Sequence, residues 1–471
     1  MIQNELQGFY AGVFSDKRLD KRACKFLKDM SKKGSSIINQ CYSSHAESQG
    51  AYRLLNNDKC SIEGLISASY TNCKINSEPS NHLLCIQDTT DINYTSHIKG
   101  IGFSDIDLGP GGMDAGAVFF CHPTLVIDAE SCQPLGFSSV ELWNRSWDKK
   151  DKHERGYKNL PIEEKESYRW LKSVTTSELT LGDNKIKTFI SDRESDIYQL
   201  FLLSDSNKHF LIRSTGLKRT DESQSIRNTV GQWKMDYSFE LIIKSNNKRK
   251  NRIARLDIAY GKISILRPLN LKSTDYPAQI ELYCVYVKEQ ADSIPHGEEA
   301  IEWLLLTTHQ LTNIQEALQC VQWYKQRWYI EELFRLLKKQ GLNVEASQLE
   351  SGIALKRLIL FSLQAALLMM TLKIAYDKTD KSCLWKQIFS KHEIELLKIL
   401  LPTLEGKTKK QKNPFKEESI AWCAWIIAKL GSWKGYKSQS PPGYITFKRG
   451  LDNFFCKFEL FLTIAKNVCK E

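Results

Sequence analysis

The sequence predicts an α/β protein in which a mixed β-sheet lies between two helical ends of the chain. Apolar residues recur at helical spacing between residues 16 and 72, short runs rich in β-forming residues follow from about residue 82, and long helical patterns return after residue 313. The 471 residues suffice for about three domains of ~150 residues each. We therefore place an all-α N-terminal domain at residues 1–75, an α/β domain at 76–370 and an all-α C-terminal domain at 371–471.

The first long helix is predicted to be amphipathic, with an apolar packing face and strongly basic remaining faces. The apolar residues are Leu19, Ala23, Phe26, Leu27 and Met30, and the basic residues are Lys17, Arg18, Lys21, Arg22, Lys25 and Lys28. Asp16 is expected to cap this helix, and Ser61 is expected to cap a later one. Such a basic surface either binds nucleic acid or is merely solvated, and this pattern alone leaves both interpretations open.

The central part of the chain is predicted to alternate strands with helices. The main strands are Leu83–Ile86, Ala117–Ile127, Leu135–Leu142, Ile186–Ile190, Phe210–Ile212 and Trp303–Thr307. A helix at Glu163–Ser173 separates the third strand from the fourth, and this order indicates a mixed sheet with helices on its faces.

Residues 215–300 interrupt this pattern, and we interpret them as an inserted β-subdomain with a basic run. Its strands are predicted at Phe239–Ile243, Arg252–Tyr260, Lys262–Leu266 and Ile280–Val287. After the strand at Trp303–Thr307, a single long helix is predicted from about Asn313 to Lys339.

Composition narrows the class of protein. An apolar fraction of 42% and a charged fraction of 26% are typical of a globular protein, and the N-terminus lacks a secretory signal, so we expect a cytoplasmic protein. The longest apolar stretch, Leu358–Leu372, is shorter than the ~20 residues of a membrane span and predicts a buried helix. Thirteen cysteines without a C-x-x-C pair argue against disulfides and zinc. A net charge of +11 favours nucleic acid over membrane lipid as the partner.

Two aspartates follow predicted strands directly. Asp88 comes after Leu83–Ile86 in the segment CIQDTTD, and Asp192 comes after Ile186–Ile190 in TFISDRESD. Sites in open α/β sheets form at strand ends, although a lone aspartate at such an end is commonly a turn or cap residue. The two aspartates together are candidate ligands of a metal ion.

A third carboxylate lies on the predicted helix of residues 313–339. Tyr324, Arg327, Glu331 and Lys338 would all fall within about 60° of arc on one continuous helix. Glu332 would point away from the core and is the weaker ligand candidate. The same row of charges also fits ordinary surface ion pairs, which stabilise a protein little.

Phosphodiester chemistry explains the combination of these residues better than surface ion pairs do. Asp88, Asp192 and Glu331 could bind two Mg²⁺ ions about 3.5–4 Å apart, one activating the attacking oxygen and one stabilising the leaving oxygen. Mn²⁺ could replace Mg²⁺ because it accepts similar oxygen ligands. Arg327 and Lys338 would then bind the nearby phosphate backbone.

At these residues the chain resembles the DDE transposases of the insertion-sequence-four family. The segments that carry the likeness are QDTT at Asp88, SDRESDIY at Asp192, WLLLTT at Trp303, and Tyr324-x-x-Arg327-x-x-x-Glu331 with Lys338. Further matches are Asp16-x-Arg18-x-x-x-Arg22, GAYRLLNN from Gly50, ESYRW from Glu166, and KRKNRIAR in the insertion. The resemblance extends over nearly the whole chain.

The resemblance implies a ribonuclease-H-like catalytic core with a β-rich insertion, an N-terminal domain that binds transposon-end DNA and a C-terminal domain that pairs two subunits. It implies DNA contacts by Arg18, Arg22, Arg213, Tyr324, Arg327 and Lys338, and stacking of a flipped base on Trp303. It also implies strand hydrolysis, hairpin formation and opening, and transfer of the 3′ ends into target DNA. The partners would be double-stranded DNA and a second copy of the chain, with no membrane involved.

Alternatives to these implications remain open. Trp303 also fits a core position beside Leu304–Leu306, and Arg213 also fits a solvated strand end. Tyr444 and Phe447 depart from the tryptophan-containing pattern usual in the family tail, so details of subunit pairing carry over less directly. The competing functions are a catalytically inactive DNA-binding regulator of transposition and a nuclease that cleaves without joining ends.

Overall fold

The computed structural model describes residues 8–468 apart from several short segments. These are residues 43, 98–104, 112–115, 148–159, 223, 236, 244–250, 273, 340, 379–387, 418 and 437–438. The chain folds into two compact units, each built from segments that are distant in sequence. Unit 1 comprises Met1–Pro79, Thr89–Lys149 and Tyr329–Glu471. Unit 2 comprises Ser80–Asp88 and Lys150–Trp328.

Unit 1 begins with helices, as predicted. They are α2 (Lys17–Lys33), α3 (Ile38–Cys41), α4 (His45–Leu55) and α5 (Ile62–Ser77). All five apolar residues predicted for the packing face of α2 are buried, whereas Arg18 and Arg22 are exposed. The side chain of Asp16 accepts a hydrogen bond from the Arg18 amide, and that of Ser61 accepts one from the Gly64 amide. Both predicted N-caps are therefore confirmed.

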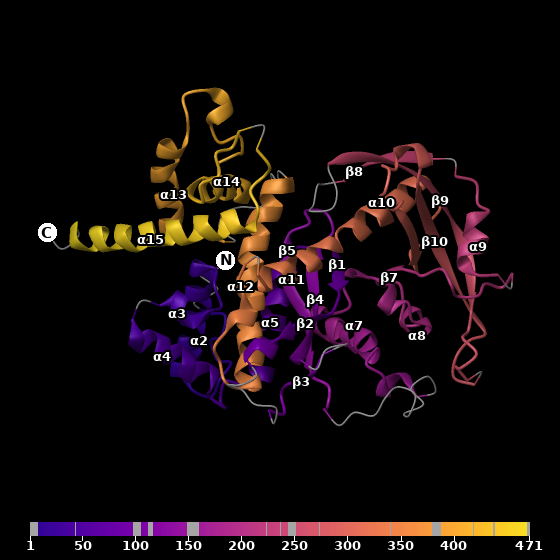
Figure 1. Cartoon of the computed structure of the whole chain (residues 1–471), viewed down its shortest axis with the longest axis horizontal. Coiled ribbons are helices and arrows are strands. Elements are labelled where there is room, and N and C mark those ends of the chain that lie inside the picture. The colour runs from indigo at the N-terminus through magenta and orange to yellow at the C-terminus, as the bar shows by residue number, and fades with distance from the viewer. Residues whose placement is uncertain are drawn as a thin grey trace. The chain divides into compact units, whose positions relative to one another are not determined.

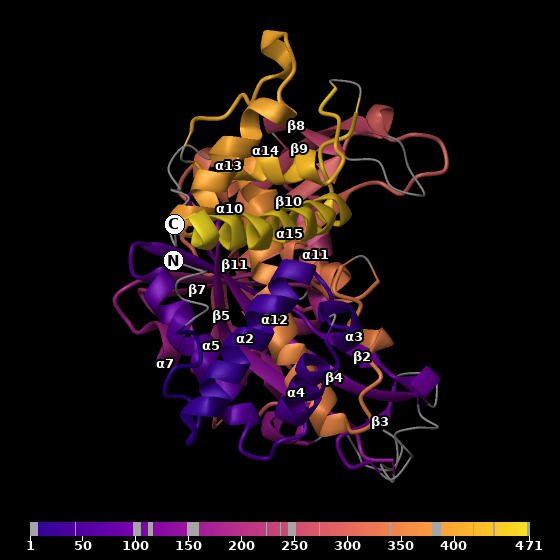
Figure 2. The same cartoon turned by 90° about the vertical axis from the view of Figure 1, so that its left-hand side faces the viewer.

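The centre of unit 1 is the apolar helix α12 (Gly352–Lys378), which packs against α2, α4, α5 and strand β5. Figures 1 and 2 show α12 running alongside the N-terminal helices. By length and composition α12 could cross a membrane, but 83% of its apolar window is buried inside the structure, as in a core helix. The predicted burial of Leu358–Leu372 is confirmed, and α12 continues through the boundary that we placed at residue 370.

The remaining elements of unit 1 are a group of antiparallel strands and the C-terminal helices. Strand β4 (Ala117–Asp128) pairs antiparallel with β2 (Thr90–Asn93), β3 (Gly109–Pro110) and β5 (Pro134–Trp143). The helices are α11 (Trp328–Leu337), which starts at the last residue of unit 2, α13 (Lys391–Leu404), α14 (Ile420–Leu430) and α15 (Tyr444–Val468). Helices α14 and α15 pack against α12 and against each other. The described residues after α12 thus form mainly helices.

Unit 2 contains a mixed sheet, in agreement with the predicted α/β class. Its strand order is β1-β6-β7-β11-β10-β9-β8. The strands are β1 (His82–Gln87), β6 (Ile186–Ser191), β7 (Lys208–Arg213), β8 (Tyr237–Ile243), β9 (Arg252–Leu266), β10 (Gln279–Glu289) and β11 (Glu302–Thr307). Strands β1, β6 and β7 are parallel, and the others pair antiparallel. The helices are α7 (Tyr168–Leu181), α8 (Tyr198–Phe201), α9 (Ile226–Gly231) and α10 (Ile314–Lys325).

Three details of unit 2 differ from the predictions. The helix expected at Glu163–Ser173 starts only at Tyr168, because Ile162–Glu164 forms a separate 3₁₀ turn. The two strands expected on either side of Gly261 are one strand, β9, in which the missing side chain of Gly261 leaves room for the ring of Trp233. The strands of residues 215–300 are confirmed, but they extend the main sheet through the β10–β11 pairing rather than forming a separate one.

The cysteines of the described residues are not paired. Ten of them are buried, Cys456 is exposed, and all are free thiols. For example, burial raises the pKa of the Cys73 thiol to about 12 and that of Cys121 to about 12. The ten buried cysteines therefore behave as core residues.

Candidate active site

The two predicted aspartates lie at equivalent positions on neighbouring parallel strands. Asp88 directly follows β1 and Asp192 directly follows β6. The register pairs Ile86 with Ile190, so both aspartates lie two residues beyond a paired position. Neighbouring strands are about 4.8 Å apart, and both side chains are only partly exposed. The structure therefore brings these two carboxylates together at the carboxyl edge of the sheet.

Arg213 lies level with Asp192 on the next parallel strand. The register pairs Ser191 with Ile212, so the next residue on each strand is Asp192 and Arg213. The guanidinium donates a hydrogen bond from Nη2 to the carbonyl oxygen of Glu302 at 3.1 Å. Its Nε is buried and has no hydrogen-bond partner among the described residues. Arg213 is thus a cation held against the sheet, one strand away from Asp192.

An aromatic pair adjoins these residues in unit 2. The rings of Trp303 and Tyr324 meet edge to face, with centroids 5.8 Å apart. Trp303 is partly exposed, whereas Leu304–Leu306 beside it are buried. Burial raises the pKa of the Tyr324 hydroxyl. The positive charges of Arg327 and Arg213 oppose this rise, whereas the negative charge of Asp192 adds to it. The side chain of Trp303 is therefore partly accessible to solvent, and the ring of Tyr324 lies within electrostatic reach of these three charges.

Arg327 is paired with the first aspartate. Its Nη1 donates a hydrogen bond to Oδ2 of Asp88 at 3.1 Å, and the two side chains form an ion pair. Both side chains are largely buried. Because charge-assisted hydrogen bonds are stronger than neutral ones, this contact fixes the direction of the Asp88 carboxylate.

The single long helix predicted for residues 313–339 is wrong. The chain forms α10 up to Lys325 and then α11 from Trp328, with a tight turn between them. In this turn the amides of Gln326 and Arg327 bond to the carbonyls of Trp323 and Tyr324, three residues back rather than four. Because this turn interrupts the helix, the common 60° arc deduced for Tyr324, Arg327, Glu331 and Lys338 no longer follows from continuous helical geometry.

Glu331 and Lys338 belong to unit 1. Glu331 lies in the first turn of α11 and is partly exposed. Lys338 follows the end of α11 and forms ion pairs with Asp91 at 3.1 Å and with Glu345 at 3.7 Å. The structure thus separates the predicted site residues between the two units.

Glu332, the weaker ligand candidate, has structural partners in unit 1. It accepts a hydrogen bond from the Tyr444 hydroxyl at 2.7 Å and pairs with Arg335 at 3.4 Å. Burial and the neighbouring Glu332 raise the pKa of Tyr444 well above its usual value. Tyr444, one of the departures from the family pattern, therefore anchors α15 to α11.

The donor atoms of unit 2 suit a hard divalent cation only in part. Carboxylate oxygens are the ligands that Mg²⁺ prefers, and Asp88 and Asp192 offer them side by side. Within the part of the chain that the structure describes, no group of three or more His, Cys, Asp or Glu residues is gathered closely enough to hold a metal ion. Glu331, the third predicted ligand, lies in unit 1.

The predicted DNA contacts of the N-terminal helices are surface residues. Arg18 bonds back to Asp16 through Nε and Nη2, both at 3.3 Å. Hydrogen bonds from the backbone and the side chain of Arg18 lower the pKa of Asp16. Arg22 is exposed one turn further along α2. Both cations are therefore accessible on the basic face of α2.

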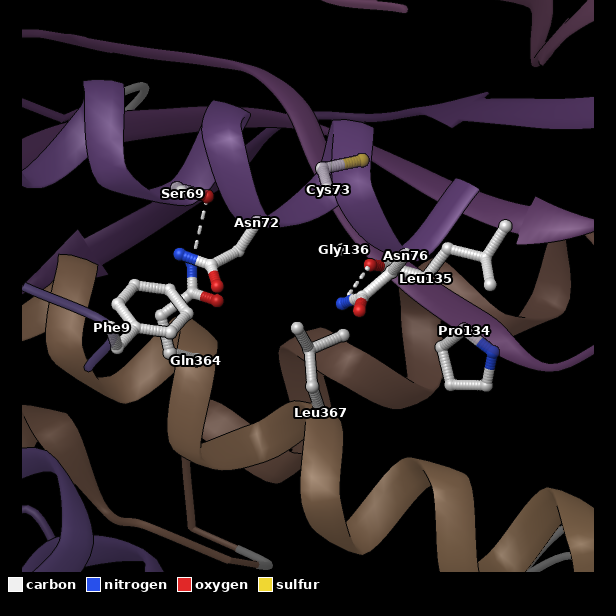
Figure 3. Close-up of a pocket in the computed structure, with 10 residues that line it drawn as sticks. All are labelled: Phe9, Ser69, Asn72, Cys73, Asn76, Pro134, Leu135, Gly136, Gln364 and Leu367. Atoms are coloured by element: carbon white, nitrogen blue, oxygen red, sulfur yellow. Dashed lines mark hydrogen bonds between the residues drawn. The ribbon is translucent and has the colours of Figure 1, made fainter. Parts of the chain in front are cut away.

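A small pocket lies elsewhere in unit 1, between α5, β5 and α12 (Figure 3). Its polar groups are already engaged: Gln364 Nε2 donates to Ser69 Oγ at 2.8 Å, and Asn76 Nδ2 donates to the Leu135 carbonyl at 3.1 Å. The pocket contains none of the predicted site residues.

The residues that surround Asp192 were not among the predicted site residues. Arg169 pairs with Glu194 at 2.7 Å, and Asp196 bonds to Ser214 and Lys218. The available signal was proximity in sequence, since Glu194 and Asp196 belong to the SDRESD segment around Asp192 and Arg169 belongs to the segment ESYRW. Their partners lie on other elements and could not be read from local spacing.

Two family models match the chain. A transposase DNA-binding model matches residues 6–60, which include α2, α3 and α4 with Arg18 and Arg22. A transposase DDE domain model matches residues 201–369, which include Arg213, Trp303 and Glu331. Asp88 and Asp192 precede the second match. The chain therefore carries a transposase DNA-binding domain and a transposase DDE domain, and domains of the second kind typically use divalent metal ions.

Proposed function

We propose that this protein, which carries a transposase DNA-binding domain and a DDE transposase domain, performs cut-and-paste DNA transposition as an enzyme of the insertion-sequence-four type. The observation that carries the proposal is the register of β1, β6 and β7, which aligns two carboxylates and a cation at one sheet edge. Carboxylates that bind metal beside a cation that binds phosphate are the groups that phosphodiester cleavage needs.

Asp88, Asp192 and Glu331 are the proposed ligands of two Mg²⁺ ions, with Mn²⁺ as a substitute. When bound, the metal ions supply activation of the attacking oxygen and stabilisation of the leaving oxygen. Each step forms a bond from a water or 3′-hydroxyl oxygen to phosphorus and breaks a bond from phosphorus to a 3′-oxygen. In this scheme Arg327 directs the Asp88 carboxylate, and Arg213 binds a phosphate through its guanidinium.

DNA recognition is divided among several elements in this proposal. Arg18 and Arg22 bind the backbone of the transposon end, because phosphates dominate the affinity of basic surfaces for DNA. The accessible face of Trp303 stacks on a base extracted from the duplex, which repays part of the cost of unstacking. Tyr324, behind Trp303, supports the stacking ring, while Lys338 and Arg327 contact nearby phosphates.

The reaction sequence we propose has four steps at each end: strand hydrolysis, attack of the freed 3′-hydroxyl to form a hairpin, hairpin opening, and joining to target DNA. Two copies of the chain would hold the two ends as a homodimer. Transposition would take place in the cytoplasm, on chromosomal DNA.

The test is incubation of the purified protein with DNA that contains the inverted repeats flanking its gene, with and without Mg²⁺. We expect metal-dependent release of the element by the wild type and its loss in Glu331→Ala. End binding without cleavage, under conditions where another transposase is active, would instead support a non-catalytic regulator. Cleavage without any joined product would support a plain nuclease.

A further inference from the structure

The turn that carries Asp192 is held from two sides. This turn, Asp192–Asp196, contains a 3₁₀ helix whose N-cap is Asp192, with Oδ1 accepting from the Glu194 amide at 3.0 Å. Glu194 is paired with Arg169 of α7 at 2.7 Å. The orientation of the Asp192 carboxylate therefore depends on the position of the whole turn.

The far end of the turn is tied to the loop that follows Arg213. Asp196 Oδ2 accepts a hydrogen bond from the Ser214 hydroxyl at 2.6 Å, and Oδ1 pairs with Lys218. The side chain of Asp196 is only 4% exposed and that of Lys218 is 17% exposed. Few carboxylates are so deeply buried, and breaking such a pair leaves an uncompensated charge.

The loop Ser214–Lys218 is in turn fixed to the sheet. The Ser214 amide donates to the Leu304 carbonyl at 2.7 Å, and the Gly216 amide donates to Ser214 Oγ at 3.0 Å. Gly216 has a positive φ of 77°, and a side chain there would approach Leu304 and Arg227 closely. Asp196 thus connects two loops at the carboxyl edge, one carrying Asp192 and the other following Arg213.

We propose that Asp196 is a positioning residue for the reaction: its buried carboxylate holds the Asp192 turn against the loop after Arg213 and so keeps the metal ligand level with the phosphate-binding cation. This role rests on the proposed function of Asp192 and Arg213. Residues that orient metal ligands typically change metal affinity or activity by about 10–100-fold when they are replaced.

The test compares Asp196→Ala and Asp196→Asn with the wild type in two assays. The first is Mn²⁺ affinity by calorimetry without DNA. The second is metal-free binding of a duplex that carries the inverted repeat. We expect Asp196→Ala to weaken Mn²⁺ binding about tenfold. Asp196→Asn should have a smaller effect, because its amide oxygen still accepts from Ser214. Duplex affinity should fall in the same order.

A matched control separates positioning from general stability. Glu178→Gln disrupts other largely buried ion pairs, those with Lys187 of β6 at 3.0 Å and with Lys208 of β7 at 3.2 Å, near the opposite ends of these strands. It should lower the melting temperature in the same way as Asp196→Ala without changing either affinity. If Asp196→Ala fails to fold, Ser214→Ala, which removes one neutral hydrogen bond, should still weaken Mn²⁺ binding measurably.

A double-variant cycle tests whether Asp196 acts through Arg213. The losses in duplex affinity of Asp196→Ala and Arg213→Gln should be less than additive, because each disturbs the same contact. If Asp196→Ala binds both Mn²⁺ and the duplex with the affinity of the wild type, the positioning role of Asp196 is overturned. A wild type that binds the duplex but no Mn²⁺ would contradict the proposed metal site, and the duplex cycle would then still decide about Asp196. A wild type that binds neither Mn²⁺ nor the duplex would overturn both the metal site and the role of Asp196.

Discussion

Arg327 holds Asp88 through an ion pair of 3.1 Å in which the two side chains are only 15% and 20% exposed. The pair joins the turn between α10 and α11 to the end of β1. A metal ion and a cationic side chain compete for the same carboxylate oxygens. The state of this pair should therefore depend on the divalent cation.

Arg327→Gln should destabilise the metal-free protein by about 1–3 kcal/mol, because it leaves the partly buried Asp88 carboxylate without its charged donor. Added Mg²⁺ should restore part of this loss by neutralising the carboxylate. Urea unfolding with and without Mg²⁺ measures both effects. Arg335→Gln, which disrupts the more exposed pair with Glu332, is the control and should respond equally in both conditions. An Arg327→Gln loss that is the same with and without Mg²⁺ would contradict a metal-binding role of Asp88.

Glu331 and Glu332 should have opposite phenotypes. Glu332→Gln weakens the contacts to Tyr444 and Arg335 and should cost about 1 kcal/mol in unfolding free energy with little loss of cleavage. Glu331→Gln should abolish cleavage, because it removes the proposed third ligand. Denaturation curves and a cleavage assay on repeat-containing DNA check both variants together. Loss of cleavage in Glu332→Gln alone would reassign the third ligand.

Arg22→Gln should weaken binding to transposon-end duplex without affecting stability, because Arg22 is exposed on the basic face of α2. Removing one phosphate contact should reduce the slope of log affinity against log salt by about 1. Lys74→Gln on α5 is the matched control, since Lys74 is an exposed cation outside the matched DNA-binding segment. An equal slope change in both variants would indicate a non-specific charge effect.

The packing face of α2 and the strand ends could be predicted because they depend on local periodicity. Residues such as Leu27 repeat at helical spacing, and Asp88 and Asp192 follow apolar runs directly. The break at Gln326 could not be predicted, because the segment contains no glycine or proline and its turn is set by bonds to Trp323 and Tyr324. Tertiary contacts override local propensity there.

The alignment of Asp88, Asp192 and Arg213 was likewise beyond the sequence. It depends on the parallel pairing of β1, β6 and β7, and β1 and β6 are separated by about a hundred residues in the sequence. The register between such distant strands leaves no periodic signal in the sequence. The anchoring of Asp196 by Lys218 was missed for the same reason. The residue types of the site were therefore predictable, whereas their supporting contacts required the structure.

Acidification should destabilise the histidine cluster of unit 2. Burial, with help from His209 and His82, lowers the pKa of His309 from 6.5 to about 3. Below pH 6.5 the unfolded chain therefore binds a proton that folded His309 does not, so stability falls as the pH decreases from 6.5 toward 3. The contribution of His309 is at most about 1.4 kcal/mol per pH unit.

His309→Gln, whose side chain can still bond to Thr188, should reduce this slope in urea unfolding curves recorded between pH 7 and pH 5. The control is His296→Gln, because His296 is exposed. Some slope should persist in His309→Gln, since burial also lowers the pKa of His209. Identical slopes in the wild type and His309→Gln would contradict this origin of the acid sensitivity.

Fe²⁺-mediated cleavage of the polypeptide tests the shared metal site most directly, because Fe²⁺ can occupy a site of oxygen ligands and reduces added hydrogen peroxide to hydroxyl radicals that cut the chain beside it. Mass spectrometry identifies the fragments. We predict cuts next to Asp88, Asp192 and Glu331. Excess Mg²⁺ should suppress these cuts, and they should be absent in Asp192→Asn. Cuts confined to other segments, or an unchanged pattern in Asp192→Asn, would contradict a shared metal site at these three carboxylates.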